Sequence, residues 1–343
     1  MRSLPRNLKA NLTRFLPVIC AIAVCFAWPL VQQVGATQQQ VTPPNAAKSA
    51  PVSSPPVKSE AATKVVADAI EGLEKYSSIK ADLRESVVMG TRRFVATGKY
   101  TQGSDNQLRL TLEIQPIEET ASVSTDGKKK ATRKKKTAAS EPSSVTQVSD
   151  GRMLWTEWKT NDTARVERRD LQEIAKAVEG DQRWQSPEQL MADLGLGGVP
   201  ALLTSLQKRM VFQGVRDQEV DGKPFVVVQG RWSEEQLKRF NAQDPDPILP
   251  PHVPEYVRVF FEKKTMFPRR IMFLKRHPVP QQRLARPMVT LDLTNVELNG
   301  PVDPDLFRFA GDSKNQNDTT EDFIKALKQQ PAPPQQPAGS AGQ

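Results

Sequence analysis

Residues 78–89 read SIKADLRESVVM, residues 94–100 read FVATGKY and residues 108–114 read LRLTLEI. In all three runs apolar and polar residues alternate. Because successive side chains of a β-strand point to opposite faces, this period of two predicts strands with one apolar face and one wet face. The apolar positions are Ile79, Ala81, Leu83, Val87 and Met89 in the first run, Phe94, Ala96 and Tyr100 in the second, and Leu108, Leu110, Leu112 and Ile114 in the third. Almost nothing reactive interrupts them, so the sequence says more about what this sheet could hold than about any bond it could break.

The remaining pattern extends this sheet and adds helices. An amphipathic helix precedes the first strand, with Thr63 as its predicted cap. Asp-Gly pairs at residues 150–151 and 221–222 each stand between two apolar runs and predict hairpin turns. Asp170 and Ser186 are predicted to begin two further helices. About eleven strands result, nearly all joined by hairpin-type turns, which indicates an α+β fold with a strongly curved antiparallel sheet.

The beginning of the chain differs from this domain. Residues 1–36 combine four basic residues, an apolar run and small residues before a cleavage position, which predicts a signal peptide and an exported, periplasmic protein. An uncleaved signal that anchors the chain to a membrane is the alternative, because two prolines and a Gln-Gln pair make the cleavage site imperfect. Both cysteines, Cys20 and Cys25, lie in this segment, so a mature chain would have no disulfide. Residues 37–60 are rich in Pro, Ser and Gln and are predicted to be a disordered spacer.

One domain is predicted at residues 61–311, interrupted by a Lys-rich loop insertion at residues 116–143. Residues 312–343 are predicted to be a mostly disordered tail, in which an amphipathic turn around Phe323, Ile324 and Leu327 is the ordered part. The formal net charge of the chain is +9, but four positive charges lie in the signal segment and seven between Lys128 and Lys136. The folded body is therefore close to neutral.

The run between Lys128 and Lys136 has two interpretations. A solvated loop is the simpler one, and contact with an anionic membrane surface or another polyanion is the alternative. Nucleic acid is not an expected partner, because no aromatic residue interleaves the run to stack on bases.

Groups that titrate, attack or bind metal are scarce. The two histidines, His252 and His277, lie in separate proline-flanked loops and are predicted to be exposed. No nucleophile elbow, phosphate-binding loop or pair of metal-binding histidines occurs in the sequence. The acidic residues that could act in acid–base chemistry are scattered over strands and turns, namely Asp82, Glu85, Asp150, Asp292 and Asp303. The sequence therefore predicts a protein that is not an enzyme and has no cofactor or metal.

Three stretches, in this order, resemble a known family. They are ADAIEGLEKYSSIKADLRES at residues 67–86, VSDGRMLW at residues 148–155 and LNGPVDPDLFRF at residues 298–309. Together they are similar to the LolA/LolB-like periplasmic lipoprotein carriers, which serve outer-membrane lipoprotein sorting. The resemblance implies a half-open β-barrel whose concave apolar face is covered by helices and holds the acyl chains of lipoproteins.

The resemblance and the periodicity together give two sets of candidate residues. The ligand cavity would be lined by Ile79, Leu83, Val87, Met89, Phe94, Tyr100, Leu108, Leu110, Leu112 and Trp155. A movable lid would present Leu171, Ile174, Leu190, Met191, Leu194, Leu202 and Leu206, with the glycines of residues 195–198 as a flexible break. The function expected is that of a carrier or chaperone for lipid or lipoprotein acyl chains. The alternative is an envelope sensor or protein-interaction module on the same fold, and a filled core would show the same periodicity.

Overall fold

The computed structural model describes residues 58–89, 92–117, 143–160, 163–181, 190–191, 197–239, 249–276, 285–311 and 316–329. Several sequence-based expectations lie outside these residues. They are the signal peptide, most of the spacer, the run from Lys128 to Lys136, the start of the helix predicted at Ser186, Leu194, His277 and the end of the tail. Among the described residues, no helix is both long and apolar enough to span a membrane.

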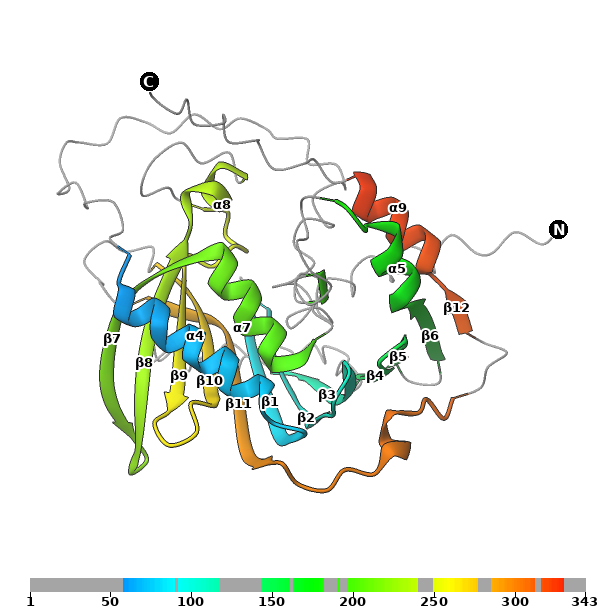
Figure 1. Ribbon diagram of the computed structural model, residues 1–343, viewed down its shortest axis with the longest axis horizontal. Helices are drawn as coiled ribbons and strands as arrows, with labels where there is room; N and C mark the ends of the chain where they lie inside the picture. Colours follow the sequence, from blue (N-terminus) through cyan, green and yellow to red (C-terminus); the bar gives the residue numbers. More distant parts are fainter. Residues whose placement is uncertain are drawn as a thin grey trace, which may run out of the picture.

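A single sheet forms the frame of the molecule (Figure 1). Its strand order is β12-β6-β5-β4-β3-β2-β1-β11-β10-β9-β8-β7. The strands are β1 (Ile79–Met89), β2 (Arg92–Gln102), β3 (Gln107–Pro116), β4 (Ser143–Asp150), β5 (Met153–Thr160), β6 (Thr163–Asp170), β7 (Met210–Val220), β8 (Lys223–Trp232), β9 (Tyr256–Glu262), β10 (Pro268–Lys275), β11 (Arg286–Leu298) and β12 (Gln316–Asp318). All described pairs are antiparallel except β12 with β6. The predicted fold class, a curved and unclosed sheet covered by helices, is confirmed, and the twelfth strand comes from the tail.

Turns and one close approach shape this sheet. Asp221 and Gly222 both have positive φ, 52° and 73°, which is the geometry of a tight two-residue hairpin. At the other Asp-Gly pair, Asp150 Oδ1 accepts hydrogen bonds from the amides of Arg152 and Met153, at 2.8 and 2.7 Å. A Cβ on Gly98 would lie 1.7 Å from the carbonyl oxygen of Thr111. Only glycine therefore allows β2 and β3 to approach this closely in the middle of the curved sheet.

Five α-helices are present in the described part of the chain. They are α4 (Glu60–Glu74), α5 (Leu171–Ala177), α7 (Gly198–Arg209), α8 (Glu234–Arg239) and α9 (Thr320–Gln329), with a 3₁₀ turn η1 (Pro304–Phe307). The cap of α4 is Ser59 rather than the predicted Thr63, because the Ser59 amide also donates to the Phe212 carbonyl of β7 at 2.9 Å and fixes the helix start there. Asp170 caps α5 as predicted, accepting from the amides of Gln172 and Glu173.

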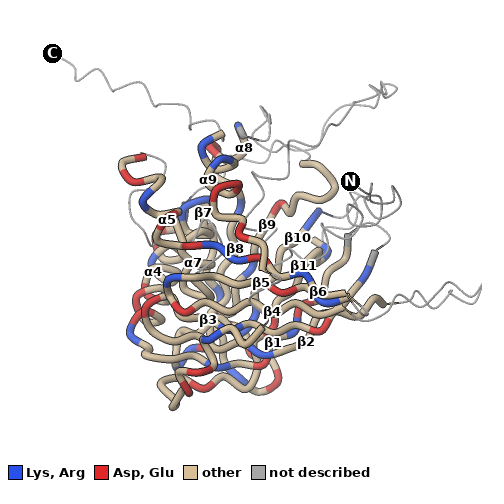
Figure 2. Tube along the Cα trace, turned by 90° about the vertical axis from the view of Figure 1, so that its right-hand side faces the viewer, with Lys and Arg blue, Asp and Glu red and all other residues tan. Residues whose placement is uncertain are grey.

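Two pairs of helices pack on the sheet, one pair near each end. Helices α4 and α7 lie side by side across β7 to β11 and β1, as Figure 1 shows, and their apolar residues join the largest buried cluster. Helix α9 packs on α5 at the other end, where Leu327 contributes to a second, smaller cluster. The amphipathic turn predicted around Phe323 is thus a helix, and the folded part of the chain continues to Gln329. Acidic and basic residues are interspersed over the described elements, as Figure 2 shows.

Candidate functional site: the covered face of the sheet

We call the sheet face beneath α4 and α7 the inner face. It carries the apolar parity of the first three strands, and each side chain of this set that the structure describes is at most 6% exposed within the largest cluster. Of the predicted lining residues it contains Ile79, Leu83, Val87, Phe94, Tyr100, Leu108, Leu110 and Leu112. Met89 lies in β1, but its side chain is outside the described part.

Trp155 lies on the opposite face of the sheet. The register pairs Trp155 with Val148 and Val148 with Arg109, which have the parity opposite to that of the lining residues. Its ring stacks on Phe309 with centroids 5.9 Å apart, and its indole N–H donates to Gln316 Oε1. On β5 it is Trp158 that packs against the inner-face cluster, and Trp232 of β8 packs against it as well.

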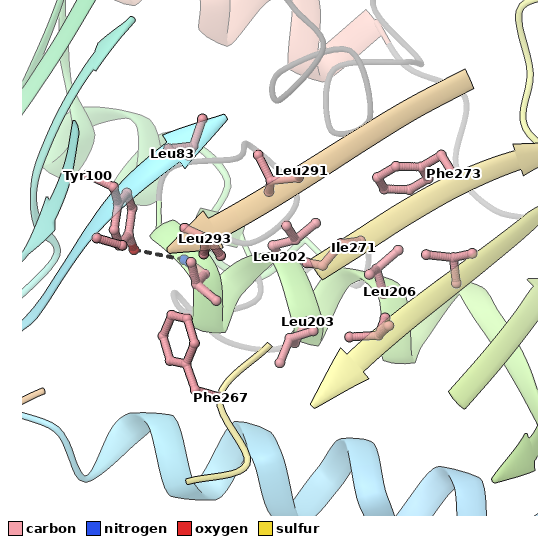
Figure 3. Close-up of a cluster of buried hydrophobic side chains, with 14 of the residues drawn as sticks. Leu83, Tyr100, Leu202, Leu203, Leu206, Phe267, Ile271, Phe273, Leu291 and Leu293 are labelled. Carbon is pink, nitrogen blue, oxygen red and sulfur yellow. Dashed lines mark hydrogen bonds between the residues drawn. The ribbon is translucent and has the colours of Figure 1, made fainter. Parts of the chain in front are cut away.

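The predicted lid residues separate into two groups. Leu202 and Leu206 of α7 contact the inner face, and Figure 3 shows them opposite Leu291 and Ile271 of the sheet. The other four described lid residues belong to the second cluster, together with Leu154 and Leu327; they are Leu171, Ile174, Leu190 and Met191. Helix α4 also covers the inner face, although it was not predicted as part of the lid.

The N-terminal end of α7 is tied to the inner face by Tyr100. The Tyr100 hydroxyl accepts a hydrogen bond from the Val199 amide at 2.9 Å and donates to Gln102 Oε1 (Figure 3 shows the first of these). Gly198 has a φ of +66°, and a Cβ there would lie 2.2 Å from the Tyr100 hydroxyl. Burial raises the pKa of Tyr100 above its ordinary value, so the hydroxyl stays protonated.

Removing the Tyr100 hydroxyl is expected to loosen α7. In Tyr100→Phe, the buried Val199 amide loses its partner, which should lower the free energy of unfolding by about 1–3 kcal/mol. Urea unfolding would measure the loss, and faster hydrogen exchange at the Val199 amide would locate it. Tyr76→Phe is the matched control, because the Tyr76 hydroxyl makes only a long 3.4 Å bond to the Thr265 carbonyl. Equal losses of stability in the two variants would contradict the role of the Tyr100 hydroxyl in holding α7.

Glu85 is the one acidic residue on the apolar parity of β1. It is 4% exposed, and its Oε1 atom has no hydrogen-bond partner among the described residues. Burial raises the pKa of Glu85 to about 8. The carboxyl is therefore mostly neutral at pH 7 and offers both a donor and an acceptor. Sequence reasoning treated Glu85 as one of several scattered acids; the signal that could have found it is its place between Leu83 and Val87.

The other described carboxyls that are less than 9% exposed are both paired. Glu167 contacts Arg165 and Arg169 on β6. Glu255 forms an ion pair with Lys275 Nζ at 3.2 Å and accepts a hydrogen bond from Arg276 Nε at 2.7 Å. Glu85 differs from them because its Oε1 atom has no such partner among the described residues. An ion pair therefore does not explain why the Glu85 carboxyl is buried.

The described residues contain no group of three or more His, Cys, Asp and Glu arranged to hold a metal ion. His252 is exposed in the loop before β9. The buried side chains of the inner face offer mainly apolar contact, with Tyr100 and Glu85 as polar groups among them.

No protein-family model matches the chain, and no curated protein does. The solved structures that it is similar to include a DUF1329 family protein from Desulfovibrio piger, with 8% identity over 73% of this chain and 97% of that chain and a TM-score of 0.29. A domain described as an outer membrane lipoprotein-sorting protein from Vibrio parahaemolyticus has 9% identity over 71% and 95%, with a TM-score of 0.26. LprF from Mycobacterium bovis has 12% identity over 73% and 97%, with a TM-score of 0.31. Each likeness concerns the fold alone.

Proposed function

We propose that this protein is a non-enzymatic carrier or chaperone, working outside the cytoplasm, that binds acyl chains of lipoproteins or other lipids on the inner face. The observation that carries this proposal is the extent of the apolar surface. One row of register partners crosses seven strands, and all but one of its members are apolar; they are Ile114, Ala96, Glu85, Leu291, Ile271, Val259 and Val228.

The dimensions and energetics of this row suit an acyl chain. Six strand spacings of about 4.8 Å give a length of about 29 Å. A membrane leaflet, half of a hydrocarbon core about 30 Å thick, holds a whole acyl chain within about 15 Å. Exposing a sixteen-carbon chain to water costs on the order of 12 kcal/mol at about 0.8 kcal/mol per methylene. A carrier therefore needs a long continuous apolar surface, and a single small pocket would leave much of the chain in water.

Entry of a ligand would require α7 to move away from the sheet. Leu202 and Leu206 now occupy the space above the inner face. The start of α7 has Gly197 as its cap, without a side-chain capping bond, and the Tyr100 hydroxyl is the side-chain group bonded to the Val199 amide. This end of the helix is therefore the natural place for opening.

A bulky residue on α7 tests the binding surface. Leu202→Trp adds volume between helix and sheet, and we expect it to weaken binding of diphenylhexatriene, a purely hydrocarbon fluorescent probe, at least fivefold. The matched control is Ile117→Trp, which places the same ring at a residue that is 48% exposed directly after β3, on the parity opposite to that of the lining residues. Circular dichroism would establish that both variants fold, and Leu202→Phe is a milder substitute if Leu202→Trp does not. Equal probe affinities in wild type and in a folded Leu202 variant would contradict the proposal.

The native ligand can be sought directly. Mass spectrometry of the protein purified without detergent is expected to detect co-purifying lipid. Absence of lipid, together with no probe binding that fatty acid displaces, would favour the sensor or interaction module on the same fold.

A further inference from the structure

We propose that Glu85 is the polar contact for the bound lipid, hydrogen-bonding the ester or carboxyl head of an acyl chain that lies along the inner face. This inference rests on the proposed function and adds a ligand class to it. It separates acyl compounds, which carry a carbonyl group, from pure hydrocarbons and from lipids held only by their tails.

The position of Glu85 supports this assignment. Its register partners are Ala96 on β2 and Leu291 on β11, both buried in the inner-face cluster. Two residues before and after it on β1 stand Leu83 and Val87, which point to the same face. The carboxyl therefore lies near the middle of the apolar row. Its four neighbours on the same face of the sheet, two along β1 and one on each adjacent strand, are all apolar.

The state of the carboxyl indicates which head group it would bind. Its Oε1 atom is buried without a partner among the described residues, and such an unpaired buried polar atom calls for an explanation in a native structure. Because the raised pKa keeps the group neutral at pH 7, the carboxyl can donate to a carbonyl oxygen and accept from a hydroxyl. Phosphate heads are usually held by arginine or lysine, and Glu85 offers no positive charge. A neutral ester or carboxyl head group is therefore the hydrogen-bonding partner that suits the neutral carboxyl of Glu85.

Two ligands that differ by one polar group test the inference. Delipidated full-length protein would be loaded with diphenylhexatriene and titrated at pH 7 with methyl palmitate or with hexadecane. We expect the wild type to prefer methyl palmitate over hexadecane about threefold to tenfold, the range of one net hydrogen bond. In Glu85→Leu the preference should vanish, while the affinity for hexadecane is kept or rises. In Glu85→Gln, whose amide also donates and accepts, the preference should stay within about twofold of the wild type.

The matched control is Glu113→Leu, which removes an exposed carboxyl from the outer face of β3. It should leave both affinities unchanged. If the wild type binds both ligands and Glu85→Leu retains the preference, Glu85 is not the polar contact, and the proposed function still stands. If the wild type binds neither ligand and no probe, the proposed function itself fails and this inference with it. A carbonyl-¹³C label on the ester gives a second measurement, because its chemical shift on binding should differ between wild type and Glu85→Leu.

Discussion

The Glu85→Leu variant is expected to be more stable than the wild type, by on the order of 4 kcal/mol above pH 8. The pKa of Glu85 rises from 4.5, the value of a free side chain, to about 8 in the folded protein. Each pKa unit corresponds to about 1.4 kcal/mol, so the ionised carboxyl is strongly disfavoured by the apolar inner face. Leucine removes this penalty and also the unpaired Oε1 atom.

The raised pKa of Glu85 also determines whether stability rises or falls with pH. Between about pH 4.5 and pH 8 the folded protein holds a proton on Glu85 that the unfolded chain has released. The wild type should therefore lose stability as pH rises through this window, whereas the loss due to Glu85 is absent in Glu85→Leu. Urea unfolding at pH 5 and pH 8.5 would measure both proteins. Parallel changes of wild type and variant over this range would contradict the prediction. If Glu85→Leu is both more stable and unable to prefer the acyl ligand, then the wild-type protein keeps a destabilising residue at this position because it is needed for binding.

The Glu255→Ala variant is expected to lose about 3–5 kcal/mol of stability, because it leaves a buried charge without its partner. Glu255 is 5% exposed and Lys275 is 7% exposed. The Lys275 ammonium also donates to three backbone carbonyls, those of Leu249, Pro250 and Val253, at 2.7, 2.9 and 3.0 Å. These bonds hold the loop before β9 against β10, so the loss of Glu255 should weaken both the strand and the loop.

Chemical denaturation would measure this loss, and Asp217→Ala is its control. Asp217 forms an ion pair of similar length with Lys263, at 2.7 Å, but both side chains are largely exposed. An exposed pair contributes about 0–1 kcal/mol, so the control should change stability little. If the two variants lose similar amounts, burial is not what makes the Glu255 pair important.

The alternation of apolar residues predicted the strands because it depends only on local geometry. Residues 79–88, 94–100 and 108–114 alternate in the sequence and in the structure alike, and the same rule placed eight of the lining candidates on one face. Trp155 shows the limit of this reasoning. Which face of β5 meets the cluster depends on its register with β4, and this register cannot be read from the amino-acid sequence. The sequence alone therefore predicts Trp155 for the lining, whereas Trp158 is the ring of β5 that packs against the cluster.

The helices were harder to place, since their packing depends on residues far apart in the chain. The four described lid candidates from residues 171–191 belong to one cluster with Leu327 of α9, and not to the inner-face cluster. The composition of the tail gave little sign that α9 would fold back onto α5. Ser59 caps α4 because Phe212, more than 150 residues later, accepts its amide hydrogen. Such contacts are made only once the sheet has formed.

The unclosed sheet has two border strands, β12 and β7, and each is poorly suited to pair with another molecule. The border strand β12 has only three residues, all polar, while the outer half of β7 carries exposed charges such as Arg216, Asp217 and Glu219. At the other half of β7, the Ser59 amide already takes the carbonyl of Phe212. Short, charged or covered borders are how natural sheets avoid aggregating edge to edge. The sheet can therefore stay open, with a concave apolar surface, without edge-to-edge aggregation of the protein into fibres.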